Sequence, residues 1–110
     1  LLMGNAPVDV YRDMGNTFAQ GIGNMDSAIV YYTKVIQLNP KDTPSMINMG
    51  IALGIQKRYD ESIAMLQRAA EITPNDPNIF RNIAIAYTQK GNRTKADEYM
   101  SKASALSAGK

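Results

Sequence analysis

The sequence repeats itself at an interval of 34 residues, and this period limits the possible fold more than any other feature of the chain. Pro40 matches Pro74 at this offset, and several further pairs are alike in size. These pairs are Met46 with Phe80, Met49 with Ile83, Gly50 with Ala84, Leu53 with Tyr87, Leu66 with Met100 and Ala69 with Ala103. Periods of about 20 to 50 residues are typical of proteins built from stacked copies of one small unit. We therefore expect a repeat protein.

Apolar residues within each unit recur at spacings of three, four and seven, which are the spacings along one face of an α-helix. The residues with this pattern are Met46, Met49, Gly50 and Leu53 in the second unit and Tyr11, Met14, Gly15 and Phe18 in the first. These two sets lie 35 residues apart, so the first unit contains one extra residue. We place it between Gln20 and Asn24, where Gly21 and Gly23 can adopt unusual backbone dihedral angles at little cost.

Each unit is predicted to contain two helices joined by a short connection. The predicted ranges are 8–21, 25–38, 44–56, 60–72, 77–90 and 94–107. Asp26, Asp60 and Thr94 are spaced by 34 residues and each has a side-chain oxygen, so we predict that they cap the second helix of each pair. Short loops make consecutive helices antiparallel neighbours, and a pair that cannot bury its own apolar face stacks on the next pair.

The spacing of these residues resembles the tetratricopeptide repeat (TPR), whose pattern is a large residue, then Leu-Gly, Tyr, Ala, Phe, Ala and Pro. The matching residues are Tyr11, Met14, Gly15, Phe18, Ala28, Tyr32, Val35 and Pro40; then Met46, Met49, Gly50, Leu53, Ser62, Leu66, Ala69 and Pro74; then Phe80, Ile83, Ala84, Tyr87, Ala96, Met100 and Ala103. Ser62, Ala84 and Ala108 depart from the pattern. The resemblance implies an all-α fold, an α-solenoid of three TPR pairs whose six antiparallel helices form a right-handed superhelix.

The predicted array covers residues 8–107, in repeats of about 8–42, 43–76 and 77–107. Residues 1–7 are predicted to be the stump of a preceding helix or a linker, which would make the chain a fragment of a larger protein. The alternative is that Leu1, Leu2 and Met3 pack on the exposed side of the first pair. In the third unit, polar residues replace the apolar ones that the earlier units offer to the next pair; these are Arg93, Asp97 and Ser104. A terminal repeat needs a polar outer side, so the array is predicted to end here. We expect the chain to fray from Ala105, with residues 108–110 outside the array.

Glycine inside a helix costs roughly 1 kcal/mol relative to alanine, so Gly50 requires a reason. Gly15, Gly50 and Ala84 occupy the same repeat position, and we expect each to lie where the two helices of a pair cross, opposite the small residues Ala28, Ser62 and Ala96. Helix backbones approach to about 8 Å only when the residues at the crossing point are small. The helix propensity lost at Gly50 would then be offset by close packing.

In a curved stack of this kind the first helix of each pair lines the concave side, so its residues that are not needed for the core are candidates for binding. The candidate groove residues are Arg12, Asn16, Gln20, Ile47, Asn48, Ile51, Ile55, Arg81, Asn82, Ile85 and Gln89. The isoleucines would form an apolar stripe, and the asparagine amides can both donate to and accept from an extended backbone. This combination favours a peptide as the ligand.

TPR domains that hold chaperone C-terminal tails use a clamp for carboxylates, made of bases and asparagines on the first helices. The resemblance places Arg12, Asn16 and Asn48 in the first three clamp positions, but Asn78 and Asn82 stand where the last two bases belong. Losing two cations removes much of the charge-assisted bonding to a terminal dicarboxylate. The alternative is that Asn48 and Asn82 bond within the stack.

Composition argues against several other functions. The chain has no cysteine and no histidine, so it lacks thiolate ligands, the commonest metal ligand and the usual proton shuttle near neutral pH. We predict no enzyme activity and no cofactor. The net charge of +2 is spread along the chain without a basic block, which predicts no nucleic-acid binding, although pentatricopeptide repeats of similar length bind RNA. No apolar run reaches the roughly 18 residues of a membrane span. The lack of cysteine permits a reducing compartment and slightly favours the cytoplasm.

The sequence thus predicts a non-enzymatic module that binds a peptide segment of a partner protein in its concave groove. Self-assembly through the exposed ends of the stack is the alternative, suggested by the apolar residues Leu1, Leu2 and Met3.

Overall fold

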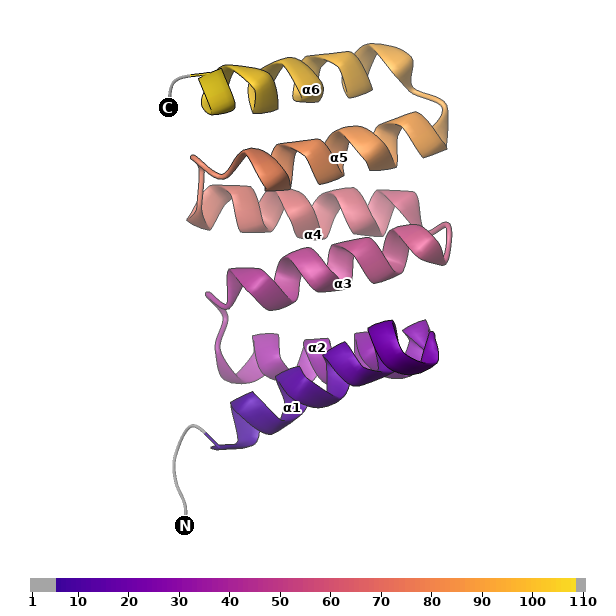
Figure 1. Cartoon of the computed structure of the whole chain (residues 1–110), viewed down its shortest axis with the longest axis vertical. Helices are drawn as coiled ribbons and strands as arrows, with labels where there is room; N and C mark the ends of the chain where they lie inside the picture. Colours follow the sequence, from indigo (N-terminus) through magenta and orange to yellow (C-terminus); the bar gives the residue numbers. More distant parts are fainter. Residues whose placement is uncertain (1–5, 109–110) are drawn as a thin grey trace.

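The chain folds into a stack of three helical hairpins (Figure 1). The computed structural model describes residues 6–108, apart from the side chains of Ala6 and Ile22. Its helices are α1 (Ala6–Asn16), continued by the π-helical turn η1 (Thr17–Ile22), α2 (Met25–Leu38), α3 (Thr43–Ile55), α4 (Tyr59–Ile72), α5 (Pro77–Lys90) and α6 (Arg93–Ala108). The described residues contain no strand. The all-α solenoid predicted from the repeat is confirmed, and the helix ends lie within two residues of the predicted ones.

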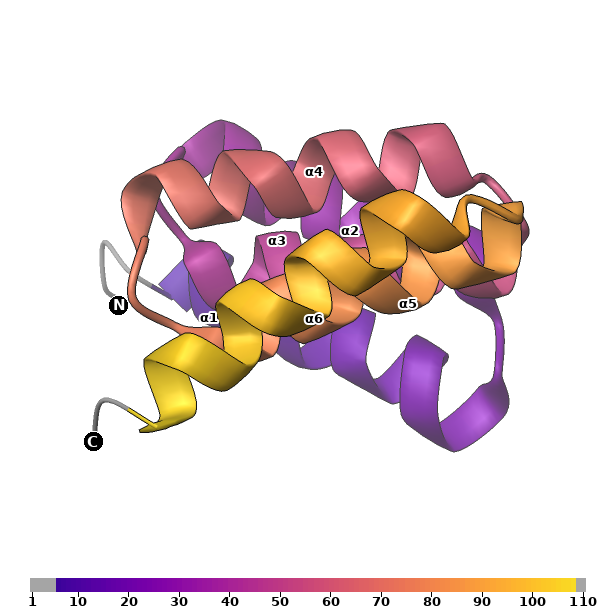
Figure 2. The same ribbon diagram turned by 90° about the horizontal axis from the view of Figure 1, so that it is seen from above.

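Each helix packs against its neighbours in the chain, and α3 also contacts α5, the first helix of the next hairpin. The stack measures 48 × 30 × 21 Å. Seen along its length, α4 and α6 are not parallel, so successive hairpins are turned relative to one another (Figure 2). This rotation leaves the first helices α1, α3 and α5 neighbouring one another along one side of the stack.

The extra residue of the first repeat lies inside a helix and not in the turn that follows it. The last turn of the first helix widens into η1, which absorbs one more residue than an α-helical turn. Gly23 then ends the helix with φ of 74°, a left-handed conformation that favours glycine. The repeat-equivalent residue of the second hairpin is Lys57, which adopts φ of 66°. The predicted position at Gln20–Asn24 therefore overlaps the end of η1, and the extra residue is accommodated within a helix.

Side-chain caps stand two residues before those predicted for the second helices. The Asn24 side chain accepts from the Ser27 N–H at 3.1 Å, and the Asn92 side chain accepts from the Lys95 N–H at 3.1 Å. The helix α4 begins after Arg58 with no side-chain cap. Asp26 and Asp60 are instead inside the first turn, where the helix dipole favours a negative charge. The prediction of Asp26, Asp60 and Thr94 as caps was thus wrong, because α2, α4 and α6 begin at Met25, Tyr59 and Arg93, one residue before each of them.

The core is a continuous cluster that runs between hairpins. Its buried members come from α2 to α5; they are Ile36, Met46, Ile63, Leu66, Ala69, Ile79, Ile83 and Ala86. Met100, one of the residues that match the repeat pattern, is 42% exposed. Its repeat equivalent Leu66 is only 1% exposed because α5 follows α4, whereas no described helix follows α6.

Gly50 allows α3 and α4 to pack closely, as the sequence predicted, but the residue that fills the space is not the one expected. The Ser62 hydroxyl does lie against Gly50 and donates to its carbonyl oxygen at 2.6 Å. The volume beside the Gly50 Cα, however, is occupied by Leu66, whose Cγ would lie 2.7 Å from a Cβ at this position. Gly15 has the same relation to Tyr32 in the first hairpin. The glycine therefore accommodates a large side chain one turn beyond the small residue.

The third hairpin ends the described stack with a polar surface. Arg93, Asp97 and Ser104 are all exposed on α6, as the sequence predicted. Residues 105–108 belong to α6, which continues through Ala108, and Arg81 donates to the Ser107 Oγ at 2.9 Å; the expected fraying from Ala105 stays a prediction. Residues 1–5, including Leu1, Leu2 and Met3, and residues 109–110 lie outside the described residues. Within the described part, none of the helices is both long and apolar enough to span a bilayer.

Candidate functional site

Two neighbouring hollows lie along the side of the stack formed by the first helices. The larger, of about 190 Å³, is lined by Gly50, Ile51, Gly54, Ile55, Ser62, Leu66, Asn82, Ile85, Ala86 and Gln89. The smaller, of about 160 Å³, is lined by Ala19, Gln20, Met25, Tyr32, Asn48, Ile51, Ala52 and Ile55. Because Ile51 and Ile55 belong to both, the hollows are two parts of one surface, which we call the groove. It extends from the end of η1, across α3, to α5.

The groove is apolar and uncharged. Ile51, Ile55 and Ile85 are 41%, 59% and 48% exposed and together form an apolar patch on this surface, which is more informative than a single exposed apolar residue. None of the residues that line either hollow is an aspartate, glutamate, lysine or arginine. Its polar groups are the amides of asparagine and glutamine and the hydroxyls of Ser62 and Tyr32. The surface can thus bury apolar side chains and form neutral hydrogen bonds.

Asparagines on the first two hairpins bond to each other at the edge of the groove. The Tyr32 hydroxyl donates to Asn16 Oδ1 at 2.6 Å, and Asn48 Nδ2 donates to the same oxygen at 3.2 Å. Burial raises the pKa of Tyr32, so its hydroxyl remains a donor at neutral pH. These bonds tie α1, α2 and α3 together. Asn48 therefore bonds within the stack, which is the alternative that the sequence left open for this residue, and Asn16 is its partner.

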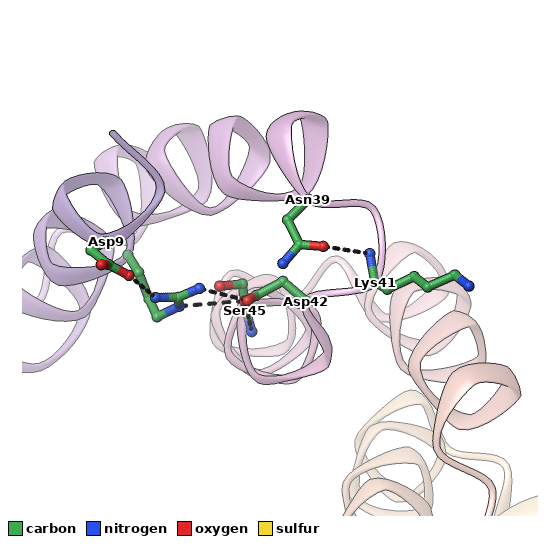
Figure 3. A network of polar contacts seen from close by, with 6 residues as sticks. Asp9, Asn39, Lys41, Asp42 and Ser45 are labelled. Carbon is green, nitrogen blue, oxygen red and sulfur yellow. Dashed lines mark hydrogen bonds and ion pairs between the residues drawn. The ribbon is translucent and has the colours of Figure 1, made fainter. Parts of the chain in front are cut away.

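Arg12 forms an ion pair at the junction of the first two hairpins. Its Nη2 lies 2.6 Å from Asp42 Oδ1 and its Nη1 lies 2.9 Å from Asp9 Oδ1. Asp42, which is 8% exposed, also caps α3 by accepting from the Ser45 N–H at 3.2 Å (Figure 3). Burial alone would raise the pKa of Asp42, but the hydrogen bonds from Arg12 and Ser45, with the charge of Arg12, lower it below its usual value.

This pair makes the stability of the stack sensitive to acid. Because the pKa of Asp42 is lower in the folded than in the unfolded chain, the pair stabilises the fold above about pH 4, the ordinary range of an aspartate, and loses this effect as the pH falls through the folded pKa. We expect Asp42→Asn to weaken the decline of the unfolding free energy below about pH 4. Urea unfolding measured between about pH 2 and pH 7 checks this. An unchanged acid decline in the variant would mean that other carboxylates cause it.

The predicted groove residues divide into two groups. The structure brings together Gln20, Asn48, Ile51, Ile55, Asn82, Ile85 and Gln89 around the two hollows. Four others do not line them. Arg12 and Asn16 bond at the hairpin junction, Ile47 packs against the core cluster, and Arg81 donates to Asn78 Oδ1 at 2.6 Å and to Ser107.

Several lining residues were not among the predicted ones. Met25 comes from a second helix, α2, and Ala86 is a small residue on α5. Gly54 contributes by leaving space, since a Cβ there would be 3.6 Å from the Ser62 Oγ. The sequence pointed to Ala19 and Gly54 as first-helix residues that the core does not need, and both line the hollows. No group of three or more metal-ligating side chains occurs among the described residues.

Comparison with known protein families gives matches over almost the whole array. A family profile described as "Tetratricopeptide repeat" matches residues 11–42 and 81–109, and one described as "TPR repeat" matches residues 50–91. Among curated proteins, Protein STIP1 homolog of Dictyostelium discoideum is 32% identical over 81 residues. That match covers 74% of this chain but only 14% of the relative.

Solved structures of MamA resemble the whole stack. One, of the form MSR-1, has a TM-score of 0.87 at 30% identity, and another, of the form AMB-1, has a TM-score of 0.88 at 31% identity. Each match covers 94% of this chain and 60% of the MamA chain. A further MamA structure has a TM-score of 0.88 at 22% identity and supports the fold alone. The chain thus spans less than two thirds of these relatives.

Proposed function

The chain belongs to the tetratricopeptide repeat family and is a protein-interaction module, and we propose that it binds an uncharged, largely apolar peptide segment of its partner in the groove over α3. The TPR fold is generally a non-catalytic interaction scaffold. The observation that carries the proposal is the row of exposed isoleucines, Ile51, Ile55 and Ile85, in two adjoining hollows without a charged residue.

The hollows suit side chains of moderate size. Volumes of about 190 and 160 Å³ that share Ile51 and Ile55 would accept two apolar side chains of one extended segment. Burial of such side chains stabilises a complex by about 1.5 to 3 kcal/mol each, before the entropy of association is subtracted. The apolar contacts would supply most of the affinity.

The amides around the hollows would fix the direction and register of the segment. Gln20 and Asn48 stand beside the smaller hollow, and Asn82 and Gln89 beside the larger. An extended backbone presents alternating donors and acceptors, and an amide side chain can satisfy both. The lack of cations disfavours a terminal dicarboxylate, because Arg12 is already paired with the buried Asp42.

A library of displayed random peptides, selected for binding to the immobilised chain, tests the proposal. We expect enriched peptides to be rich in aliphatic residues and poor in charge, with a dissociation constant near the micromolar range, about 8 kcal/mol. Because no charge lines the groove, their affinity should be nearly independent of salt concentration. Enrichment of acidic peptides whose binding falls steeply with salt would contradict the proposal.

The substitution Ile51→Asp should lower the affinity for the selected peptides at least tenfold, since it places a charge in both hollows. Val30→Asp is the matched control, because Val30 is 52% exposed on α2 and lies in neither hollow. Binding is measured by fluorescence anisotropy and helix content by circular dichroism. Equal losses in the two variants, or unchanged binding by Ile51→Asp, would rule the groove out.

A further inference from the structure

The junctions between hairpins are built from the same repeat positions. At the first junction, Thr33, Ile36 and Gln37 of α2 face Met49, Met65 and Arg68 of the second hairpin. At the second junction, residues exactly one period later line the corresponding space: Gln67, Ala70 and Glu71 of α4 face Ile83, Tyr99 and Lys102 of the third hairpin. In both cases the second helix of one hairpin covers the same side of the next hairpin.

The first hairpin presents this side at the N-terminal end of the stack, where α1 lies at the lower end in Figure 1. We call it the N-terminal face; its residues are Tyr11, Met14, Phe18, Tyr31 and Lys34. They occupy the repeat positions of Phe80, Ile83, Tyr87, Tyr99 and Lys102 in the third hairpin. The N-terminal face thus has the composition of a surface that elsewhere in the molecule is covered by a helix.

The side chains on the two surfaces also share one arrangement. Phe18 and Tyr31 stack at 5.6 Å between ring centroids, as Tyr87 and Tyr99 do. Tyr11 and Tyr31 lie 6.0 Å apart, and Phe80 and Tyr99 lie 6.2 Å apart. Lys34 Nζ lies 5.7 Å from the Tyr11 ring, and Lys102 Nζ lies 5.8 Å from the Phe80 ring.

Only the third-hairpin copy of this arrangement is covered by a described helix. Phe80, Tyr87 and Tyr99 pack against the core cluster, and Gln67 of α4 donates to the Tyr99 hydroxyl at 3.3 Å. Within residues 6–108, α1 packs chiefly against α2 and η1, and no helix takes the place of α4 over Tyr31. The N-terminal face is therefore arranged like a junction, but one of its two sides is missing from the described residues.

The opposite end of the stack is unsuited to fill that place. The positions that carry Tyr59, Ile63 and Ala70 on α4 carry Arg93, Asp97 and Ser104 on α6, and all three are exposed. Stacking a second copy head to tail would press Asp97 against the aromatic rings, and burying an unpaired carboxylate is strongly unfavourable. A head-to-tail copy of this chain is thus a poor occupant.

We propose that the N-terminal face holds the second helix of a further helical hairpin, supplied by a repeat that precedes this one in the full-length protein. The residues that α2 and α4 present to the next hairpin define the sequence pattern expected of this added helix. It begins with an aliphatic residue, and a polar residue follows four positions later. Seven positions after the first residue comes an aliphatic or small residue, and eight positions after it comes an amide or an acid. These are Ile29, Thr33, Ile36 and Gln37 in α2, and Ile63, Gln67, Ala70 and Glu71 in α4. An acid at the last position would face Lys34, as Glu71 shares its junction with Lys102.

The proposal can be tested by adding the same repeat to either end of the chain. In one variant, residues 43–76 replace residues 1–7 and join Val8, which keeps the repeat register; in the other, residues 43–76 follow Lys110. We expect the N-terminal addition to raise the midpoint of thermal unfolding by about 5 °C or more in a single transition, because neighbouring repeats stabilise each other. The C-terminal addition should leave the midpoint almost unchanged. Equal rises, or no rise from the N-terminal addition, would overturn the proposal.

Two further measurements identify the occupant. Tyr31→Lys should remove most of the rise in the unfolding midpoint that the N-terminal addition causes. The effect of Tyr31→Lys on the midpoint of the 110-residue chain is first subtracted. A fully retained rise would mean that the added repeat does not use the N-terminal face. Sedimentation of the 110-residue chain should give a monomer. A dimer that Tyr31→Lys dissociates would make a second copy the occupant and overturn the assignment to a preceding repeat. Neither result depends on the groove, so the proposed function is tested separately.

Discussion

Leu66→Ala is expected to lower the free energy of unfolding by about 2 to 5 kcal/mol, because it opens a cavity in the core. Leu66 is 1% exposed and belongs to the cluster that joins the hairpins, with Met46 and Ile83 among its members. Domains of this kind are stable by only about 5 to 15 kcal/mol, so this loss is a large share of the total stability. Urea unfolding followed by circular dichroism measures the loss.

Met100→Ala provides a matched control for this prediction. Met100 occupies the same repeat position as Leu66 but is 42% exposed on α6. Its truncation removes a side chain that is not enclosed, so the expected loss is below about 1 kcal/mol. Similar losses in Leu66→Ala and Met100→Ala would show that this repeat position contributes to the free energy of unfolding independently of burial by the following hairpin.

Gly50→Leu should destabilise the chain by about 1 to 3 kcal/mol or more, since it forces a side chain into an occupied space. Even a Cβ at this position would lie 2.7 Å from Leu66 Cγ and 2.9 Å from its Cδ2. The helices cannot separate freely, because the Ser62 hydroxyl is bonded to the Gly50 carbonyl at 2.6 Å. Thermal unfolding should therefore show a clear fall in the midpoint, with the helix content of the folded state retained.

Gly54→Ala distinguishes this close contact from a general effect of glycine. A Cβ at Gly54 meets its nearest neighbour, the Ser62 Oγ, at 3.6 Å, which is an ordinary contact. Alanine has a higher helix propensity by up to about 1 kcal/mol, so this variant should be neutral or slightly more stable. In addition, Gly50→Ala should be less harmful in the Leu66→Ala background, because the colliding side chain is gone. Additive losses in that double variant would contradict the proposed contact.

The agreement between sequence and structure is closest where the repeat itself carries the information. The spacing of Met46, Met49, Gly50 and Leu53 predicted an α-helix at these residues. The 34-residue period predicted that the hairpins stack in the order of the sequence. Both follow from local geometry, since residues three, four and seven apart must share a face of a helix. The polar residues on α6 correctly predicted its outer side for the same reason.

The agreement is weaker for the site, where the partner of each polar side chain matters. Arg12 and Asn48 were predicted to line the groove by their position on a first helix. The fold brings Asp42, 30 residues from Arg12 in the chain, within 2.6 Å of it, and pairs Asn48 with Asn16. Of these two, only Asn48 also lines the groove. A repeat pattern gives the direction of a side chain, but it does not give the partner that meets it across a junction.

The sequence by itself determined the class of fold, the number of hairpins and the general direction of their apolar faces, because these depend on periodicity within 34 residues. Only the tertiary structure decided that Leu66 fills the space left by Gly50, that the extra residue widens η1, and that Ile51 and Ile55 join two uncharged hollows. These features depend on where side chains from different helices meet. The place where two side chains meet is set by the packing of whole hairpins. Many residues contribute to this packing, and no single sequence motif encodes it.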